Sequence, residues 1–186
     1  MAPVSSVDQA VACAAAGATL VDVGAAGTLI PAIRRAAGGL LICGCGEDAD
    51  LVRDVNLAAR TGAGLICRDL AAAQAAVGHR IAPDRILVRC APAQIERAAE
   101  SGWATLVDVD AVAGSVAGVR AGAGSSGDAG ADGGSVAGVL AVAAVCGWLG
   151  ARVIWTRHVA GVRRALDMTE TIRGTRAPAW TIRGLA

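Results

Sequence analysis

Short apolar runs alternate with Ala-rich segments that carry Arg, Asp and Glu along the whole chain. Each apolar run has four to six Val, Ile, Leu or other apolar residues, which is the length of a strand that is buried on both faces. The pattern therefore predicts six strands, within residues 18–25, 39–45, 63–70, 85–90, 104–110 and 151–159.

The segments between the runs have the spacing and end signals of helices. Residues 6–16 begin with Ser6 and place Gln9 three positions later, which is a capping-box pattern. Further helices are predicted at 48–60, which opens with acidic residues, at 92–100, which opens with Pro92, and at 159–173, which is followed by Gly174.

Strict alternation of strands and helices predicts a parallel α/β sheet with right-handed crossovers. Two phrases recur, "LVDVGAAG" and "LVDVDAVAG", which indicates repeated βα units. The interval 111–134 is rich in Gly and Ser and is predicted to be a mobile loop, and residues 174–186 are predicted to form a separate C-terminal tail.

Composition narrows the function only a little. The formal charge of +1 gives no electrostatic reason to expect a nucleic-acid partner. The uncharged stretch 133–151 is mostly Gly, Ala and Val, so we predict a buried helix there and no membrane span. The six Cys lack the spacing of a disulfide framework and no signal peptide is apparent, so we predict a reducing, cytoplasmic location.

Function in a parallel α/β protein resides at the carboxyl ends of the strands. The strand ends present polar and ionisable side chains together with one Trp: Asp22, Thr28, Cys43, Cys45, Cys67, Arg68, Asp69, Arg89, Cys90, Asp108, Asp110, Trp155, Arg157 and His158. The thiols lack the CxxC spacing of a metal site, and the aspartates fit helix capping as well as acid–base chemistry. We therefore predict no metal site and no cofactor, and we assign no catalytic residue.

Five stretches resemble the dihydropteroate synthase family in the right order. Residues 17–28, "GATLVDVGAAGT", resemble the family's "GA-x-I-I-D-I-G-G-E-S-T". Residues 57–70, 80–90, 102–114 and 150–168 are similar to four later segments of that family. The resemblance implies a TIM barrel that binds a pterin pyrophosphate and joins it to p-aminobenzoate. With six strands found, it implies a barrel over residues 1–173 that is reduced to about six strands and is either closed, left open or completed by a second chain.

The departures from the family pattern fall on its binding groups. Asp22 and Thr28 match, but Cys67 stands where the family has a pterin-binding Asn and Arg89 where it has an Asp. The family's Arg and His fall on Trp155 and Arg157, and its Lys has no counterpart. The predicted ligand-binding residues are Asp22, Thr28, Cys67, Arg89 and Arg157.

Three functions are compatible with these residues. The first is a relative of dihydropteroate synthase without synthase activity, acting as a binding or partner subunit for a pterin-like or anionic small molecule. The alternative is a barrel enzyme with an altered, anionic substrate held by Arg89 and Arg157, unless each Arg simply pairs with a neighbouring acid such as Asp69 or Asp108. The third is a structural assembly factor. For the first two functions, we expect a homo-oligomer or a partner protein.

Overall fold

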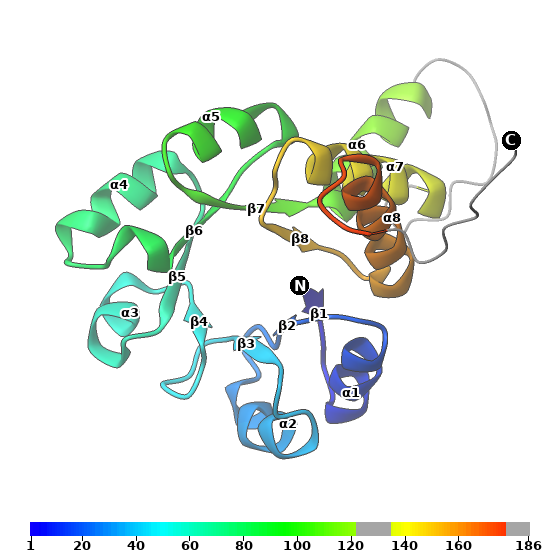
Figure 1. Ribbon diagram of the computed structural model, residues 1–186. Helices are drawn as coiled ribbons and strands as arrows, with labels where there is room; N and C mark the ends of the chain where they lie inside the picture. The colour runs from blue at the N-terminus through cyan, green and yellow to red at the C-terminus, as the bar shows by residue number, and fades with distance from the viewer. Residues whose placement is uncertain (122–134, 178–186) are drawn as a thin grey trace, which may run out of the picture.

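The computed structural model describes residues 1–121 and 135–177, and it shows a barrel of parallel strands with helices outside (Figure 1). Within these residues one sheet has eight strands in the order β1-β2-β3-β4-β5-β6-β7-β8, and all neighbouring pairs are parallel. The strands are β1 (Ala2–Pro3), β2 (Leu20–Asp22), β3 (Leu41–Cys43), β4 (Leu51–Val52), β5 (Gly64–Cys67), β6 (Ile86–Arg89), β7 (Ala104–Asp108) and β8 (Val153–Trp155).

The barrel type is confirmed, but the predicted strand number is wrong. All six predicted strands are present, and β1 and β4 are added to them. The ring is nearly closed, because the Met1 nitrogen donates to the Ile154 carbonyl (2.6 Å) and the Thr156 amide donates to the Met1 carbonyl (3.0 Å). These two bonds link β8 to the residue that precedes β1.

Helices cover most of the outer wall of the barrel. They are α1 (Val7–Ala15), α2 (Ile30–Ala36), α3 (Val55–Thr61), α4 (Leu70–Gly78), α5 (Ile95–Glu100), α6 (Val109–Ala121), α7 (Val136–Trp148) and α8 (Val159–Ile172), with short 3-10 turns η1 (Gly27–Leu29), η2 (Pro83–Arg85) and η3 (Pro92–Gln94). Ser6 caps α1 by accepting from the Gln9 amide, as its position predicts. The Gln9 side chain, however, accepts from the Ser5 amide, one residue before the cap.

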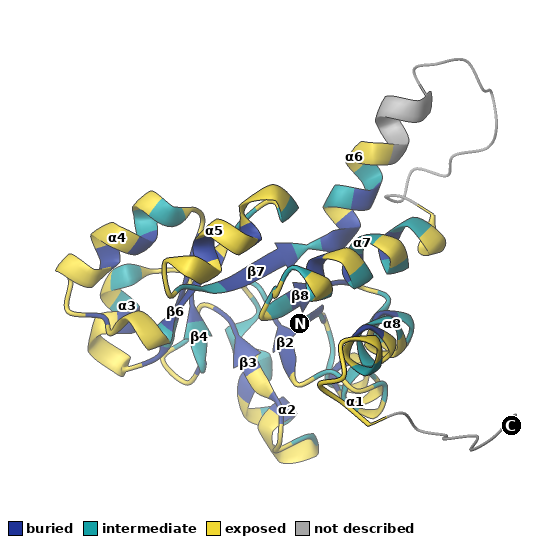
Figure 2. Ribbon diagram, turned by 45° about the horizontal axis from the view of Figure 1, so that its top comes forward, coloured by how far each residue is buried: buried dark blue, intermediate teal, exposed yellow. Residues whose placement is uncertain are grey.

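Two predicted segments have a different structure. Residues 48–60 contain β4 and then α3, and Asp54 caps this shorter helix through the Leu57 amide. The interval 111–134, predicted as a loop, begins inside α6, which continues to Ala121 and extends away from the barrel (Figure 2). Residues 122–134, and residues 178–186 of the predicted tail, lie outside the described residues.

The apolar core has an inner and an outer layer. Alternate strand residues point to the lumen, where Leu20, Cys43, Ile66, Leu87 and Leu106 pack together. The intervening residues, such as Val21 and Val107, pack against the helices in two outer clusters. α7 confirms the buried helix predicted in 133–151, and no helix among the described residues has the length and apolar character to span a membrane.

The wall between α2 and α3 has no helix of its own. The described residues 44–50 join β3 to β4 directly, and a hollow of about 720 Å³ lies there against Ile30, Arg34, Asp48 and Gly62. The β3–β4 ladder is completed by a side chain, because Asp50 Oδ2 accepts from the Ile42 amide at 2.8 Å while the Asp50 amide donates to the Ile42 carbonyl.

Replacing Asp50 with Ala should lower the free energy of unfolding by about 2 kcal/mol. The change leaves the amide of the buried Ile42 without its acceptor and removes the 3.0 Å ion pair with Arg34. Urea unfolding measures the loss, and Asp48→Ala is the matched control, since Asp48 is an exposed acid of the same loop. Equal stability of the two variants would contradict this role for Asp50.

Candidate functional site

One sequence pattern on two strands places both aspartates at the carboxyl end of the barrel. Strands β2 and β7 each read Leu-Val-Asp, in residues 20–22 and 106–108. The Leu faces the lumen and the Val faces the helices, so alternation returns the Asp side chain to the inner side. There it lies at the mouth, which is the opening of the barrel at the carboxyl ends of the strands. Asp22 and Asp108 both line the cavity found there.

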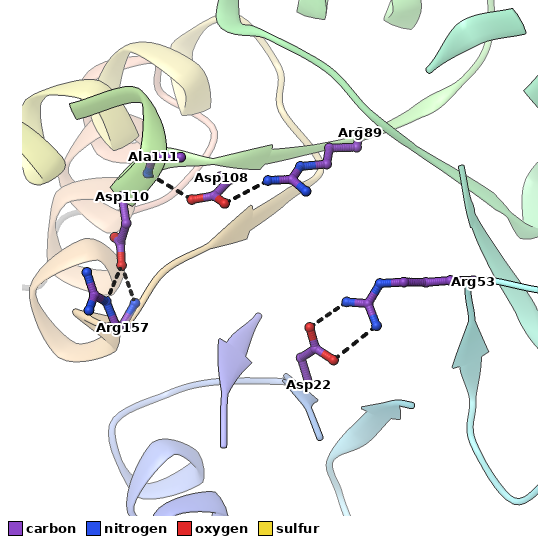
Figure 3. Close-up of polar contacts among 7 residues, drawn as sticks. All are labelled: Asp22, Arg53, Arg89, Asp108, Asp110, Ala111 and Arg157. Carbon is purple, nitrogen blue, oxygen red and sulfur yellow. Dashed lines mark hydrogen bonds and ion pairs between the residues drawn. The ribbon is translucent and has the colours of Figure 1, made fainter. Parts of the chain in front are cut away.

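A second pattern supplies the bases in the same way. The triplet Leu-Val-Arg occurs at residues 51–53 and again at 87–89. Leu51 and Leu87 belong to the lumen cluster, while Val52 and Val88 pack outside. Arg53 and Arg89 therefore reach the mouth from β4 and β6 (Figure 3).

Arg53 and Asp22 form a two-pronged ion pair across the mouth. Nη2 of Arg53 donates to Oδ2 of Asp22 at 2.5 Å, and Nη1 donates to Oδ1 at 3.3 Å. Oδ1 also accepts from the Gly24 amide at 3.0 Å. The pair joins β2 to the end of β4 and so passes over β3, as Figure 3 shows.

This pair sets the charge state of the acid. Burial by itself raises the pKa of Asp22, but hydrogen bonds from Arg53, the Gly24 amide and the Trp155 side chain outweigh it and hold the pKa below its usual range. Asp22 is therefore a carboxylate at neutral pH. Trp155, at the end of β8, is thus a further neighbour of this carboxylate.

A second ion pair lies on the opposite side of the mouth. Nη2 of Arg89 donates to Oδ2 of Asp108 at 2.8 Å, and Oδ1 of Asp108 accepts from the Ala111 amide in the first turn of α6. Asp108 thereby caps α6 and holds Arg89 with one carboxylate. Arg89 pairs with a neighbouring acid, which is one of the two arrangements expected from the sequence.

A third acid fixes the junction of β8 and α8. Asp110 is 4% exposed, and its Oδ1 accepts from the Thr156 hydroxyl at 2.7 Å. Its Oδ2 accepts from both the amide and Nε of Arg157, at 2.9 and 3.2 Å. Arg157 is therefore oriented by Asp110, and Thr156 in turn accepts from the His158 amide. The basic pair at this junction is held by a buried acid.

The mouth encloses a small cavity with two larger hollows beside it. The lumen cavity has a volume of about 130 Å³ and is lined by Met1, Asp22, Arg53, Ile66, Arg89, Leu106, Asp108 and Trp155. A hollow of about 280 Å³ shares Arg89 and Asp108 with it. Another, of about 480 Å³, shares Arg53, Ile66 and Arg89.

The predicted ligand residues are only partly brought together. Asp22 and Arg89 line the lumen cavity. Thr28 is exposed in η1, and Cys67 packs in the outer cluster, where it borders the 480 Å³ hollow. Arg157 is held at the β8–α8 junction by Asp110. A ligand role for any of these five residues stays a prediction.

Sequence reasoning missed Arg53, which forms the shortest ion pair of the mouth. It fell within a predicted helix, because two-residue strands such as β4 carry no periodicity. The repeated Leu-Val-Arg triplet was the signal that could have found it, since the second copy lies in a predicted strand.

The thiols of Cys43 and Cys67, at the ends of β3 and β5, are not activated. Burial, followed by the charge of Asp22, raises the pKa of Cys43 to about 12, so its thiol stays protonated at neutral pH. The pKa of Cys67 is also raised, first by burial and then by Asp69. In the described part of the chain, no three His, Cys, Asp or Glu side chains are grouped so that they could hold a metal ion.

The whole barrel is similar to solved dihydropteroate synthases. A structure from Xanthomonas albilineans with 7,8-dihydropteroate is 16% identical, with a TM-score of 0.70, over 90% of this chain and 86% of that one. A Thermus thermophilus structure with the ligand 6HMPPP is 18% identical, with a TM-score of 0.69, over 94% and 92%. This is the dihydropteroate synthase fold.

A third neighbour is the Mycobacterium tuberculosis protein Rv1207. It is 23% identical, with a TM-score of 0.69, over 92% of this chain and 88% of that chain. No protein-family model matches the sequence, and no curated protein matches it. The dihydropteroate synthase fold predicted from five short stretches of sequence is therefore confirmed by structure.

Replacing Asp22 with Asn should destabilise the protein in a pH-dependent way. At pH 7 the change removes the ion pair with the half-exposed Arg53, which should lower the free energy of unfolding by about 1–2 kcal/mol. Because the folded pKa of Asp22 is depressed, its contribution is present above the ordinary Asp pKa of about 3.9 and is lost as pH falls through the folded value.

Denaturant unfolding at pH 7, 5 and 3 tests this dependence. The stabilities of wild type and Asp22→Asn should approach each other toward pH 3, because Asp22 of the unfolded wild-type chain takes up a proton below about pH 3.9. Asp108→Asn gives a comparison at the second ion pair. A difference between wild type and Asp22→Asn that stays constant from pH 7 to pH 3 would contradict the assignment.

Proposed function

We propose that this protein is a dihydropteroate synthase-like binding subunit of the folate pathway that lacks synthase activity. The mutual pairing of the charged groups at the mouth carries the proposal. Asp22 is engaged by Arg53 and Asp108 by Arg89, and the lumen cavity between them measures about 130 Å³.

The chemistry of the mouth supports the same conclusion. The resemblance places a guanidinium, Arg89, where the family has a carboxylate that accepts from the amino edge of the pterin. A guanidinium has no acceptor, so it cannot take over that contact. Asp22, which matches the family pattern, already accepts hydrogen bonds on both oxygens.

The most direct test is an assay for synthase turnover. Purified protein incubated with dihydropterin pyrophosphate, Mg²⁺ and p-aminobenzoate should form no dihydropteroate above the rate without enzyme. A known dihydropteroate synthase in the same buffer is the positive control. Turnover that disappears in the Asp22→Asn variant would overturn the proposal, since the variant excludes a contaminating enzyme as its source.

We further propose that the partner is a second copy of this chain, and that the protein works in the reducing cytoplasm. α7 and α8 pack closely, since a Cβ at Gly147 would lie 2.6 Å from Leu166. Together they expose large apolar side chains to solvent: Val145, Trp148, Met168 and Ile172. One such patch can pair with itself across a two-fold axis. The six free cysteines support a reducing compartment.

The oligomer can be tested by charge insertion. The double variant Trp148→Glu with Met168→Glu should shift a dimer to a monomer, as measured by size-exclusion chromatography with light scattering. Val11→Glu with Val77→Glu is the matched control, because these residues are exposed apolar positions on α1 and α4. A wild-type protein that is monomeric at high concentration, or a dimer unchanged by the α7–α8 variant, would contradict the interface.

A further inference from the structure

The hydrogen-bonding capacity that remains at the mouth consists mainly of donors. All four carboxylate oxygens of Asp22 and Asp108 already accept at least one hydrogen bond. A guanidinium has five N–H groups. Among the described residues, Arg89 uses one of them and Arg53 two, each on its paired carboxylate. A neutral set of charges thus presents unused N–H groups to a ligand.

The exposed fractions of the side chains also show that the arginines, and not the acids, face an incoming ligand. The side chains of Asp22 and Asp108 are 10% and 16% exposed, while those of Arg53 and Arg89 are 45% and 55% exposed. Each acid therefore lies beneath its base, and each base keeps an open side. An incoming ligand contacts the guanidinium groups before it can contact the carboxylates.

The two arginines share the same empty space. Both line the lumen cavity, and both line the 480 Å³ hollow that opens between β5 and α4. They extend from β4 and β6 into the same mouth (Figure 3). Planar guanidinium groups of this kind bind carboxylate and phosphate oxygens through paired N–H donors.

We propose that Arg53 and Arg89 together bind the oxyanion head, phosphate or carboxylate, of a small acid. This inference rests on the proposed function, because it takes the mouth to be the binding site of a non-catalytic subunit. The lumen cavity of about 130 Å³ has room for a group equivalent to roughly four water molecules at ~30 Å³ each. That is the scale of one tetrahedral or planar oxyanion.

The neighbouring hollow defines the remainder of the ligand. Besides Arg53 and Arg89, the lining contains three polar side chains, Asp54, Arg68 and His79. The other lining residues are apolar and come from β5, α3 and α4: Val55, Leu65, Ile66, Cys67, Ala72, Ala75 and Ala76. An acid with a compact apolar body therefore satisfies both parts of the site, with its charge between the arginines and its body against these side chains. The predicted partner of Arg89 in anion binding changes accordingly, from Arg157 to Arg53.

Titration with the isolated head groups tests this site. Inorganic phosphate and acetate are each titrated into the full chain by calorimetry, with ionic strength held constant by chloride. Arg89→Gln removes one donor group, and it should weaken saturable binding about tenfold or more, as expected for loss of charge-assisted hydrogen bonds. Arg89→Lys keeps the charge but loses the paired donors, and it should recover only part of the affinity.

The controls separate this site from general charge and from folding. Arg60→Gln removes an exposed Arg that pairs with Glu47 outside the mouth, and it should bind like wild type. Circular dichroism is used to check that each variant is folded. This check matters most for Arg53→Gln, because that change leaves the buried carboxylate of Asp22 without its paired base. If phosphate binds and acetate does not, the head group is a phosphate; the reverse result assigns a carboxylate.

Failure of this inference is distinct from failure of the proposed function. Absence of saturable binding of both anions by wild type, or equal affinity of wild type and Arg89→Gln, overturns the anion site and leaves the absence of turnover intact. Dihydropteroate formation by a protein that binds phosphate through Arg89 overturns the non-catalytic role and leaves the anion site intact.

Discussion

The two-residue alternation of side chains along each strand is the constraint on which the rest of the structure depends. Each strand is covered on both faces, by the lumen on one side and by helices on the other. Leu20 and Leu106 fill the lumen while Val21 and Val107 meet the helices. The next inward position lies at the mouth, where the apolar layer ends and a charged side chain can reach water. The same alternation thus determines both the core and the site.

The charges at this boundary are arranged so that the more deeply placed group is always the acid. Asp22, Asp108 and Asp110 each accept a backbone amide as well as an Arg side chain. The amides come from turns that follow the strands, so each carboxylate holds the backbone where β-structure passes into the next segment. The arginines, with longer and more flexible chains, occupy the outer level. A mouth built this way holds each acid in hydrogen bonds and leaves its bases accessible.

The sequence was sufficient for the fold type and for about half of the site. Runs of four or more apolar residues identified six strands correctly, and Asp22 and Arg89 were recognised because they end such runs. β1 and β4 were missed because each is only two residues long, which is too short to show an alternation of apolar and polar positions. Their strand structure depends instead on pairing with the neighbouring strands. Because β4 was not predicted, Arg53, which directly follows it, was not recognised as a residue of the site. The outward position of Cys67 depends on the register of β5, which is fixed by its pairing with β6.

The direct connection between β3 and β4 marks where this barrel can change in length. The two strands are already held by the amide of Gly44 on the Leu51 carbonyl and by Asp50 on Ile42. Extra residues placed between 46 and 48 would emerge beside the open wall between α2 and α3 without altering the register of either strand. Insertions and deletions among proteins with this barrel should therefore concentrate in this connection, and a tag or a second domain can be introduced there with little disturbance of the mouth.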